Sequence, residues 1–226
     1  MNLINTVFRK HRNLYFNLCL ATAFSFLLLL FRIKITHSYF YTFLVWNLFL
    51  AAIPFFITQV MKYYSTWKNS KPQKILLFVT WLLFLPNSPY IITDLIHLHD
   101  HNSILKWLDL FLVFVFALNG LLLGLLSLLD MYVYIKNESS KTKAHISIFL
   151  ISVLSGYGIY LGRFLRFNSW DFLTQPLYLF EQIRISLTEP KVWAITIAFG
   201  GLLWILFLLM QSALRINTKH NTTESK

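Results

Sequence analysis

The stretch LFLVFVFALNGLLLGLLSLL, residues 110–129, contains no charged side chain and decides the fold class. A bilayer core about 30 Å thick is crossed by about 20 apolar residues in an α-helix. The apolar residues here form one continuous run, without the polar face that a surface helix of a soluble protein keeps. We therefore predict that this stretch spans a membrane as an α-helix.

Five further stretches have the same character, and together the six occupy most of the 226 residues. In the whole chain 57% of the residues are hydrophobic and only 13% are charged, against about 25% charged in an average soluble domain. The short alternating strands of a membrane β-barrel do not occur. We predict an all-α bundle of six transmembrane helices that forms one domain over residues 1–226. The predicted spans lie near residues 14–32, 39–61, 75–93, 109–132, 144–162 and 192–213.

The net charge of +11 is distributed unevenly across the predicted membrane. Of the 20 Lys and Arg residues, thirteen fall on the side that holds both termini and seven on the other side. Basic residues accumulate on the cytoplasmic side of a membrane, so we expect both termini in the cytoplasm. The same residues attract anionic lipid headgroups. Without a basic soluble module, the charge does not predict nucleic-acid binding.

The third predicted span contains the segment FLPNSPYIITDLIHL, residues 84–98, which carries Pro86 and Pro89. A proline has no backbone N–H, so the carbonyls four residues before the two prolines lose their helical donors. Inside a membrane, such carbonyls must bond to protein or to water. Two interpretations fit the segment: a broken helix that faces a polar cavity, with Asn87 and Ser88 at the break, or a helix that ends early.

A shorter amphipathic stretch lies between the fifth and sixth spans, near residues 170–188. Its apolar residues recur at helical spacing, and its charged residues fall elsewhere. This pattern is typical of a helix that lies flat in the membrane interface. We expect the helix on the side opposite the two termini. Its apolar positions are Leu173, Leu177, Phe180, Ile183 and Leu187.

Polar residues from distant parts of the sequence are expected to meet on that same side. Four of them share one face of the third helix if that helix continues past its prolines, because they are spaced by three, four and three residues. Four more follow one another from the end of the fifth span. We predict that these residues line a pocket that binds a ligand. The predicted ligand-binding residues are Asn87, Tyr90, Asp94, His97, Arg163, Arg166, Asn168 and Asp171.

Three interpretations of this pocket stay open. The first is structural: Asp94 and Arg163 pair with each other, because a single charge in a membrane is costly to desolvate. In the second, Arg163 and Arg166 bind an anionic group such as a lipid phosphate, which a planar guanidinium matches with two hydrogen bonds. In the third, Asp94, His97 and Asp109 hold a divalent metal ion.

Two segments also resemble a known family: FLPNSPYIITDLIHL, residues 84–98, and GIYLGRFLRFNSWD, residues 158–171. They resemble the signature stretches of the bacterial membrane-protein family called domain of unknown function 1361. The resemblance extends from the second hydrophobic run to the sixth and implies a multi-pass protein of the bacterial plasma membrane. It implies no activity, because the family has none assigned. The matching residues, which do not include His99 or His101, are Pro86, Asn87, Pro89, Tyr90, Asp94, His97, Gly162, Arg163, Arg166, Asn168, Trp170 and Asp171.

The function predicted from these residues is non-catalytic: a membrane protein whose extracytoplasmic polar pocket binds an anionic lipid headgroup or a partner subunit. One alternative is an intramembrane enzyme that acts on a lipid-linked phosphate at the outer leaflet, with Asp94 or His97 as general acid or base. A second alternative is a small-solute transporter whose site lies at the broken third helix. The expected partners are membrane lipids, with other membrane proteins or a homo-oligomer as further candidates. The sequence points to no particular cofactor.

Overall fold

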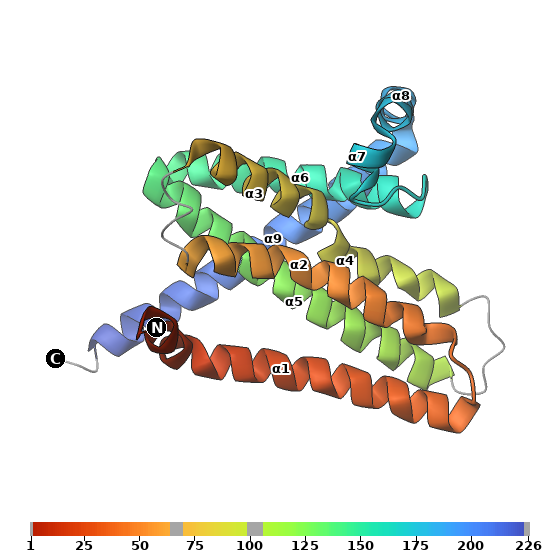
Figure 1. Ribbon diagram of the computed structural model, residues 1–226, viewed down its shortest axis with the longest axis horizontal. Coiled ribbons are helices and arrows are strands. Elements are labelled where there is room, and N and C mark those ends of the chain that lie inside the picture. Colours follow the sequence, from red (N-terminus) through yellow and green to blue (C-terminus); the bar gives the residue numbers. More distant parts are fainter. Residues whose placement is uncertain (1, 64–69, 99–105, 224–226) are drawn as a thin grey trace. The chain divides into compact units, whose positions relative to one another are not determined.

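The structure is a computed structural model that describes residues 2–63, 70–98 and 106–223 (Figure 1). Every element in these ranges is a helix, and none is a strand. Within the same ranges, six helical segments are long and apolar enough to cross a membrane. The predicted all-α, six-span architecture is therefore confirmed. The candidate spans are Arg12–Thr36, Phe40–Lys62, Lys71–Leu98, Lys106–Glu138, Lys141–Arg163 and Pro190–Leu214.

The helices run several residues beyond the predicted spans at most of their ends. The fourth span shows this clearly, because its helix α5 (Lys106–Glu138) extends past both ends of the apolar run. Lys and Glu are good helix formers, so the helix does not stop where the apolar residues stop. The next helix begins at a specific signal: the Ser140 hydroxyl accepts a hydrogen bond from the Lys143 backbone N–H at 3.3 Å, which satisfies one of the free donors of the first turn.

The contacts divide the chain into two compact units, Met1–Gly124 and Leu125–Lys226. α5 crosses the boundary, so its first half belongs to unit 1 and its second half to unit 2. That the whole chain forms one domain stays a prediction.

Unit 1 is organised around the first half of α5. Phe24 and Phe26 of the first helix make edge-to-face contacts with Phe111 and Phe116 of α5, at 6.4 and 6.2 Å between ring centroids. The Asn119 side chain of α5 donates to the first helix as well. Figure 1 shows the first helix and α2 running along this part of α5. The unit also contains α1 (Asn2–Thr36), η1 (Phe40–Thr42), α2 (Phe43–Tyr63), α3 (Lys71–Phe84), α4 (Asn87–Tyr90) and η3 (Ile91–Leu98).

The third span breaks at its prolines and then continues. α3 ends at Phe84, Leu85 and Pro86 form a turn, and α4 with the 3₁₀ helix η3 carries the chain on to Leu98 (Figure 1). Pro86 and Pro89 account for the break, because neither donates to the helical ladder. The interpretation that the helix ends early is therefore wrong.

Protein atoms, rather than an open cavity, pack against this break. The Ser88 side chain is fully buried, and its hydroxyl donates to the Ala51 carbonyl of α2 at 3.0 Å. The Leu85 carbonyl, which Pro89 deprives of a donor, accepts from the Ser88 N–H at 3.1 Å. A Cβ added at Gly124 of α5 would stand only 2.5 Å from the Ser88 Cβ. Within unit 1, these contacts give no support to a polar cavity at the break.

Unit 2 is built on a close antiparallel pair, α6 and α9. Residues later in α6 contact residues earlier in α9, which shows that the two helices are antiparallel. Phe149 contacts Trp204 at 5.2 Å between ring centroids, and Gly156 faces Gly200. A Cβ added at Gly156 would stand 2.7 Å from the Gly200 nitrogen, so the two backbones touch there, as small residues in membrane helices allow. The elements of unit 2 are the second half of α5, α6 (Lys141–Arg163), α7 (Asp171–Thr174), α8 (Pro176–Ser186) and α9 (Pro190–Thr223).

The predicted amphipathic helix is present as two shorter helices, α7 and α8, with Gln175 between them. Pro176 begins α8, a position that proline favours because its missing N–H is not needed there. Leu173 and Leu177 are 79% and 85% exposed, so the N-terminal part of the apolar stripe faces outward from the described chain. That this stripe contacts the membrane interface stays a prediction.

Candidate functional site

Asp94 is buried between η3 and α2. Its exposed fraction is 1%, and its carboxylate accepts a hydrogen bond from the Asn47 Nδ2 of α2 at 2.7 Å. A carboxylate inside a membrane protein needs such donors, because its desolvation is costly. The Asn47 amide therefore ties η3 to α2, and the sequence analysis did not identify it.

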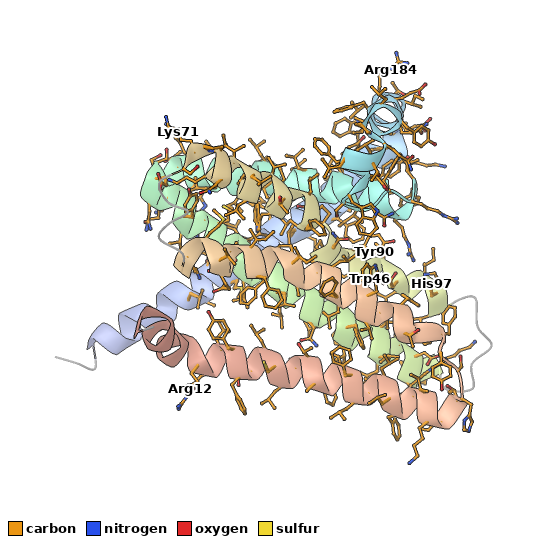
Figure 2. The ribbon with its side chains drawn as sticks, in the orientation of Figure 1. Arg12, Trp46, Lys71, Tyr90, His97 and Arg184 are labelled. Atoms are coloured by element: carbon orange, nitrogen blue, oxygen red, sulfur yellow. The ribbon has the colours of Figure 1, made fainter. Side chains whose placement is uncertain are left out.

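His97 lies one turn further along η3, near its end (Figure 2). A 3₁₀ helix repeats about every three residues, so Asp94 and His97 share a face. The imidazole makes edge contacts with Phe43 of α2 at 5.3 Å and with Phe40 of η1 at 6.1 Å between ring centroids. Asn47 and Phe43 are one α-helical turn apart on α2. The pairs Asp94–Asn47 and His97–Phe43 therefore pack one face of η3 against one face of α2.

The predicted stripe on the third span assumes one continuous α-helix, and the structure departs from that assumption. Asn87 and Tyr90 lie on α4, whereas Asp94 and His97 lie on the narrower helix η3. The Asn87 side chain donates to the Phe84 carbonyl at 2.9 Å across the break. The four side chains are therefore positioned by two different helix types.

Asp109 forms a buried ion pair with Arg32, which the sequence analysis also did not identify. The Arg32 Nε lies 3.0 Å from Asp109 Oδ1, and Nη2 lies 3.5 Å from Oδ2. The third guanidinium nitrogen donates to the Ser38 carbonyl at 2.9 Å, and the guanidinium carbon lies 4.7 Å from the centre of the Tyr41 ring. The pair links the end of α1 to the start of α5.

The proposed metal ligands do not gather around one point. Among the residues that the structure describes, no group of three or more His, Cys, Asp or Glu side chains is placed to hold a metal ion. Asp109 bonds to Arg32 and Asp94 bonds to Asn47. His99 and His101 lie outside the described residues. The metal hypothesis for Asp94, His97 and Asp109 therefore gains no support.

The end of α6 presents the two arginines of the predicted site. Arg163 is the last residue of the helix. Arg166 is exposed and has a φ of 61°, in the left-handed region, which costs a non-glycine residue about 1 kcal/mol. A hydrogen bond of 3.1 Å from the Phe167 N–H to the Leu161 carbonyl closes this end of the helix. The fold thus holds a guanidinium in the exposed turn after α6.

Asn168 and Asp171 stabilise the next turn. Asp171 Oδ2 accepts from the Asn168 backbone N–H at 2.7 Å, and Oδ1 accepts from the Thr174 hydroxyl at 3.1 Å. Such local bonds are typical of Asp at the beginning of a helix. Asn168 and Asp171, both predicted as ligand-binding residues, therefore stabilise the start of α7.

Asp94 belongs to unit 1 and Arg163 to unit 2. The ion pair predicted between them stays a prediction, and so does a pocket that combines residues of both units.

The six apolar helices define a multi-pass membrane protein. Residues 46–206 match the family described as protein of unknown function (DUF1361), and the chain belongs to that family. The match contains both segments that carry the resemblance, which is therefore confirmed. No curated protein and no solved structure matches the chain.

Proposed function

We propose that this protein binds the phosphate of an anionic lipid headgroup at the end of α6, through Arg163 and Arg166. The observation that carries the proposal is Arg166, an exposed arginine in a backbone conformation that suits glycine better. Residues held in unfavourable backbone conformations cluster at active sites and at positions that hold ligands. A guanidinium offers a phosphate two parallel hydrogen bonds, so it is the group expected at such a position.

The neighbouring helices support a membrane ligand rather than a soluble one. The exposed apolar stripe of α7 and α8 follows the arginines directly in the sequence. An apolar helix face of this kind enters the headgroup region of a bilayer. Arginines beside it would lie at the depth of the lipid phosphates, where each basic residue contributes about 1 kcal/mol of attraction to anionic lipid.

The distribution of Lys and Arg favours the extracytoplasmic face for this site, with both termini in the cytoplasm. The two alternative functions, an enzyme and a transporter, have less support from the structure. An enzyme that uses Asp94 or His97 needs access to side chains that pack against α2 and η1. A transporter site at the broken third span needs space where Ser88 contacts α2 and α5.

The proposal is tested by counting bound lipids with native mass spectrometry. The protein is exchanged into mixed micelles with equal amounts of dioleoyl phosphatidylglycerol and dioleoyl phosphatidylcholine. The variant Arg163→Gln/Arg166→Gly removes both guanidinium groups, and glycine suits the backbone at position 166. We expect the enrichment of phosphatidylglycerol to fall at least about fivefold, since about 1 kcal/mol per arginine is lost.

The matched control is Arg184→Gln, which removes an exposed arginine of α8 (Figure 2). It measures the general attraction of one interfacial cation to anionic lipid, so it should lower the enrichment clearly less than Arg166→Gly does. Arg166→Gly alone covers the case in which the double variant does not fold. Equal enrichment in the wild type and in a folded Arg166→Gly variant would contradict the proposal. A second protein chain that is lost from the variant in place of lipid would favour the partner-subunit hypothesis.

A further inference from the structure

An open hollow of about 480 Å³ lies where the end of α6 meets the start of α9. The two helices touch at Gly156 and Gly200, and the hollow begins about one turn beyond that contact. Its lining is mostly apolar. The lining residues are Tyr160, Phe164, Glu189, Lys191, Ala194 and Ile195.

The wall on α6 is a stack of aromatic rings that other contacts hold in place. Tyr160 and Phe164 stack with 5.3 Å between ring centroids and 19° between ring planes, and Tyr157 continues the stack below Tyr160 at 6.3 Å. The Tyr157 hydroxyl bonds to the Ser186 hydroxyl of α8 at 2.7 Å. Phe164 is 58% exposed. A flat ring surface of this kind, at the end of a membrane span, fits an extended acyl chain.

The rim of the hollow carries two charges of opposite sign. Glu189 and Lys191 flank Pro190, the first residue of α9, and both side chains are exposed. A cation alone would suit any lipid phosphate. A carboxylate beside it opposes a lipid of net negative charge and attracts a lipid that carries an ammonium group close to its phosphate.

We propose that this hollow binds one zwitterionic phospholipid with a primary ammonium headgroup, of the ethanolamine type. Its phosphate lies at Lys191 and its ammonium group at Glu189. An acyl chain lies against Tyr160, Phe164 and Ile195. A primary ammonium donates hydrogen bonds to a carboxylate, whereas a quaternary choline cannot, so the site distinguishes phosphatidylethanolamine from phosphatidylcholine. This site differs from the one proposed at Arg163 and Arg166 in both its residues and its lipid.

The test is native mass spectrometry of the full chain in micelles with equal amounts of dioleoyl phosphatidylethanolamine, phosphatidylcholine and phosphatidylglycerol. We expect the wild type to retain the ethanolamine lipid over the choline lipid by roughly two- to fivefold, the ratio that one exposed charge pair gives. Glu189→Gln should reduce this ratio to about one. Ala194→Phe, which places a phenyl ring in the hollow, should reduce the retained ethanolamine lipid.

Two controls make the result specific. Glu181→Gln removes an exposed carboxylate of α8 that does not line the hollow, and it should leave the ratio unchanged. Arg163→Gln/Arg166→Gly should change retention of phosphatidylglycerol without changing the ratio of ethanolamine to choline lipid. A wild type that retains the two zwitterionic lipids equally overturns the proposal, as does a folded Glu189→Gln variant with an unchanged ratio. A dimer that only Ala194→Phe dissociates also overturns it, because a second copy then occupies the hollow.

Discussion

Arg32 and Asp109 form a buried ion pair within unit 1, with 3.0 Å between Arg32 Nε and Asp109 Oδ1. Both side chains are buried, and the guanidinium makes further contacts with the Ser38 carbonyl and the Tyr41 ring. Removing two charges from water is costly, and the cost is offset only when nearly every donor and acceptor finds a partner. The further contacts of Arg32 meet that condition, so the loss of either charge leaves an uncompensated charge in the membrane span.

We therefore expect Asp109→Leu to lower the free energy of unfolding by about 3 kcal/mol. The double variant Arg32→Met/Asp109→Leu should recover most of this loss, because it leaves neither member of the pair as an unpaired buried charge. Thermal unfolding of the detergent-purified protein measures both effects. Lys34→Met is the matched control, since Lys34 is an exposed cation near the end of α1. If Asp109→Leu unfolds at the same temperature as Lys34→Met, the ion pair has no stabilising role.

At the scale of elements, the broken third span depends on glycines of its neighbour. α4 approaches α5 closely enough that a Cβ at Gly124 would collide with the Ser88 Cβ. A Cβ at Gly120 would stand 2.8 Å from the Ile91 Cδ1. Glycines four residues apart lie on the same face of a helix, so together they form the surface against which the break packs.

Gly124→Ala should destabilise the protein by about 1–3 kcal/mol, the usual effect of overpacking a filled site. Gly201→Ala in α9 is the matched control: an added Cβ meets nothing within 4 Å there, and alanine stabilises a helix interior by about 1 kcal/mol relative to glycine. Apparent unfolding temperatures in detergent distinguish the two substitutions.

The contact between Gly124 and Ser88 can be isolated with a second substitution. Ser88→Gly removes the opposing Cβ, so the combination Ser88→Gly/Gly124→Ala should cost less than the two single losses added together. Strict additivity would show that the break does not pack against Gly124.

At the scale of the whole molecule, the family match runs from residue 46 to residue 206 and so includes parts of both units. The match contains all or part of five of the six candidate spans. The remaining span, Arg12–Thr36, lies outside it. The proposed lipid sites both lie in unit 2, at the end of α6 and the start of α9. Their location in the membrane depends on the orientation of the chain, which the proposal assigns from the Lys and Arg distribution.

The proposed orientation is tested by cysteine labelling in intact cells. Cys19 is the only cysteine of the sequence, so Cys19→Ser provides a background without thiols. Gln175→Cys, at the exposed connection between α7 and α8, should react with a membrane-impermeant maleimide in intact cells. Ser139→Cys, at the exposed connection between α5 and α6, should react only after permeabilisation. The reverse labelling pattern would place the proposed lipid sites at the cytoplasmic face of the membrane.

The candidate site could be predicted from the sequence only in part. The arginines of positions 163 and 166 follow an apolar span, and a helix end at that point is a local property. The partners of Asp94 and Asp109 are harder to predict from the sequence. Arg32 ends the first apolar run and Asp109 begins the fourth, so opposite charges at the same predicted face were a usable signal. Asn47 offered less, because an amide in a span has no charge by which to predict a partner.

The sequence by itself determined that the chain crosses a membrane six times and that the regular helix of its third span is interrupted near its prolines, but it left open whether the helix continues beyond them. Both follow from local properties, since bilayer thickness sets the length of an apolar helix and a proline lacks its N–H wherever the chain folds. Only the tertiary structure decided that Asp109 pairs with Arg32 and that Ser88 closes the break. Such contacts depend on the rotation and register of separate helices, which a local pattern does not specify.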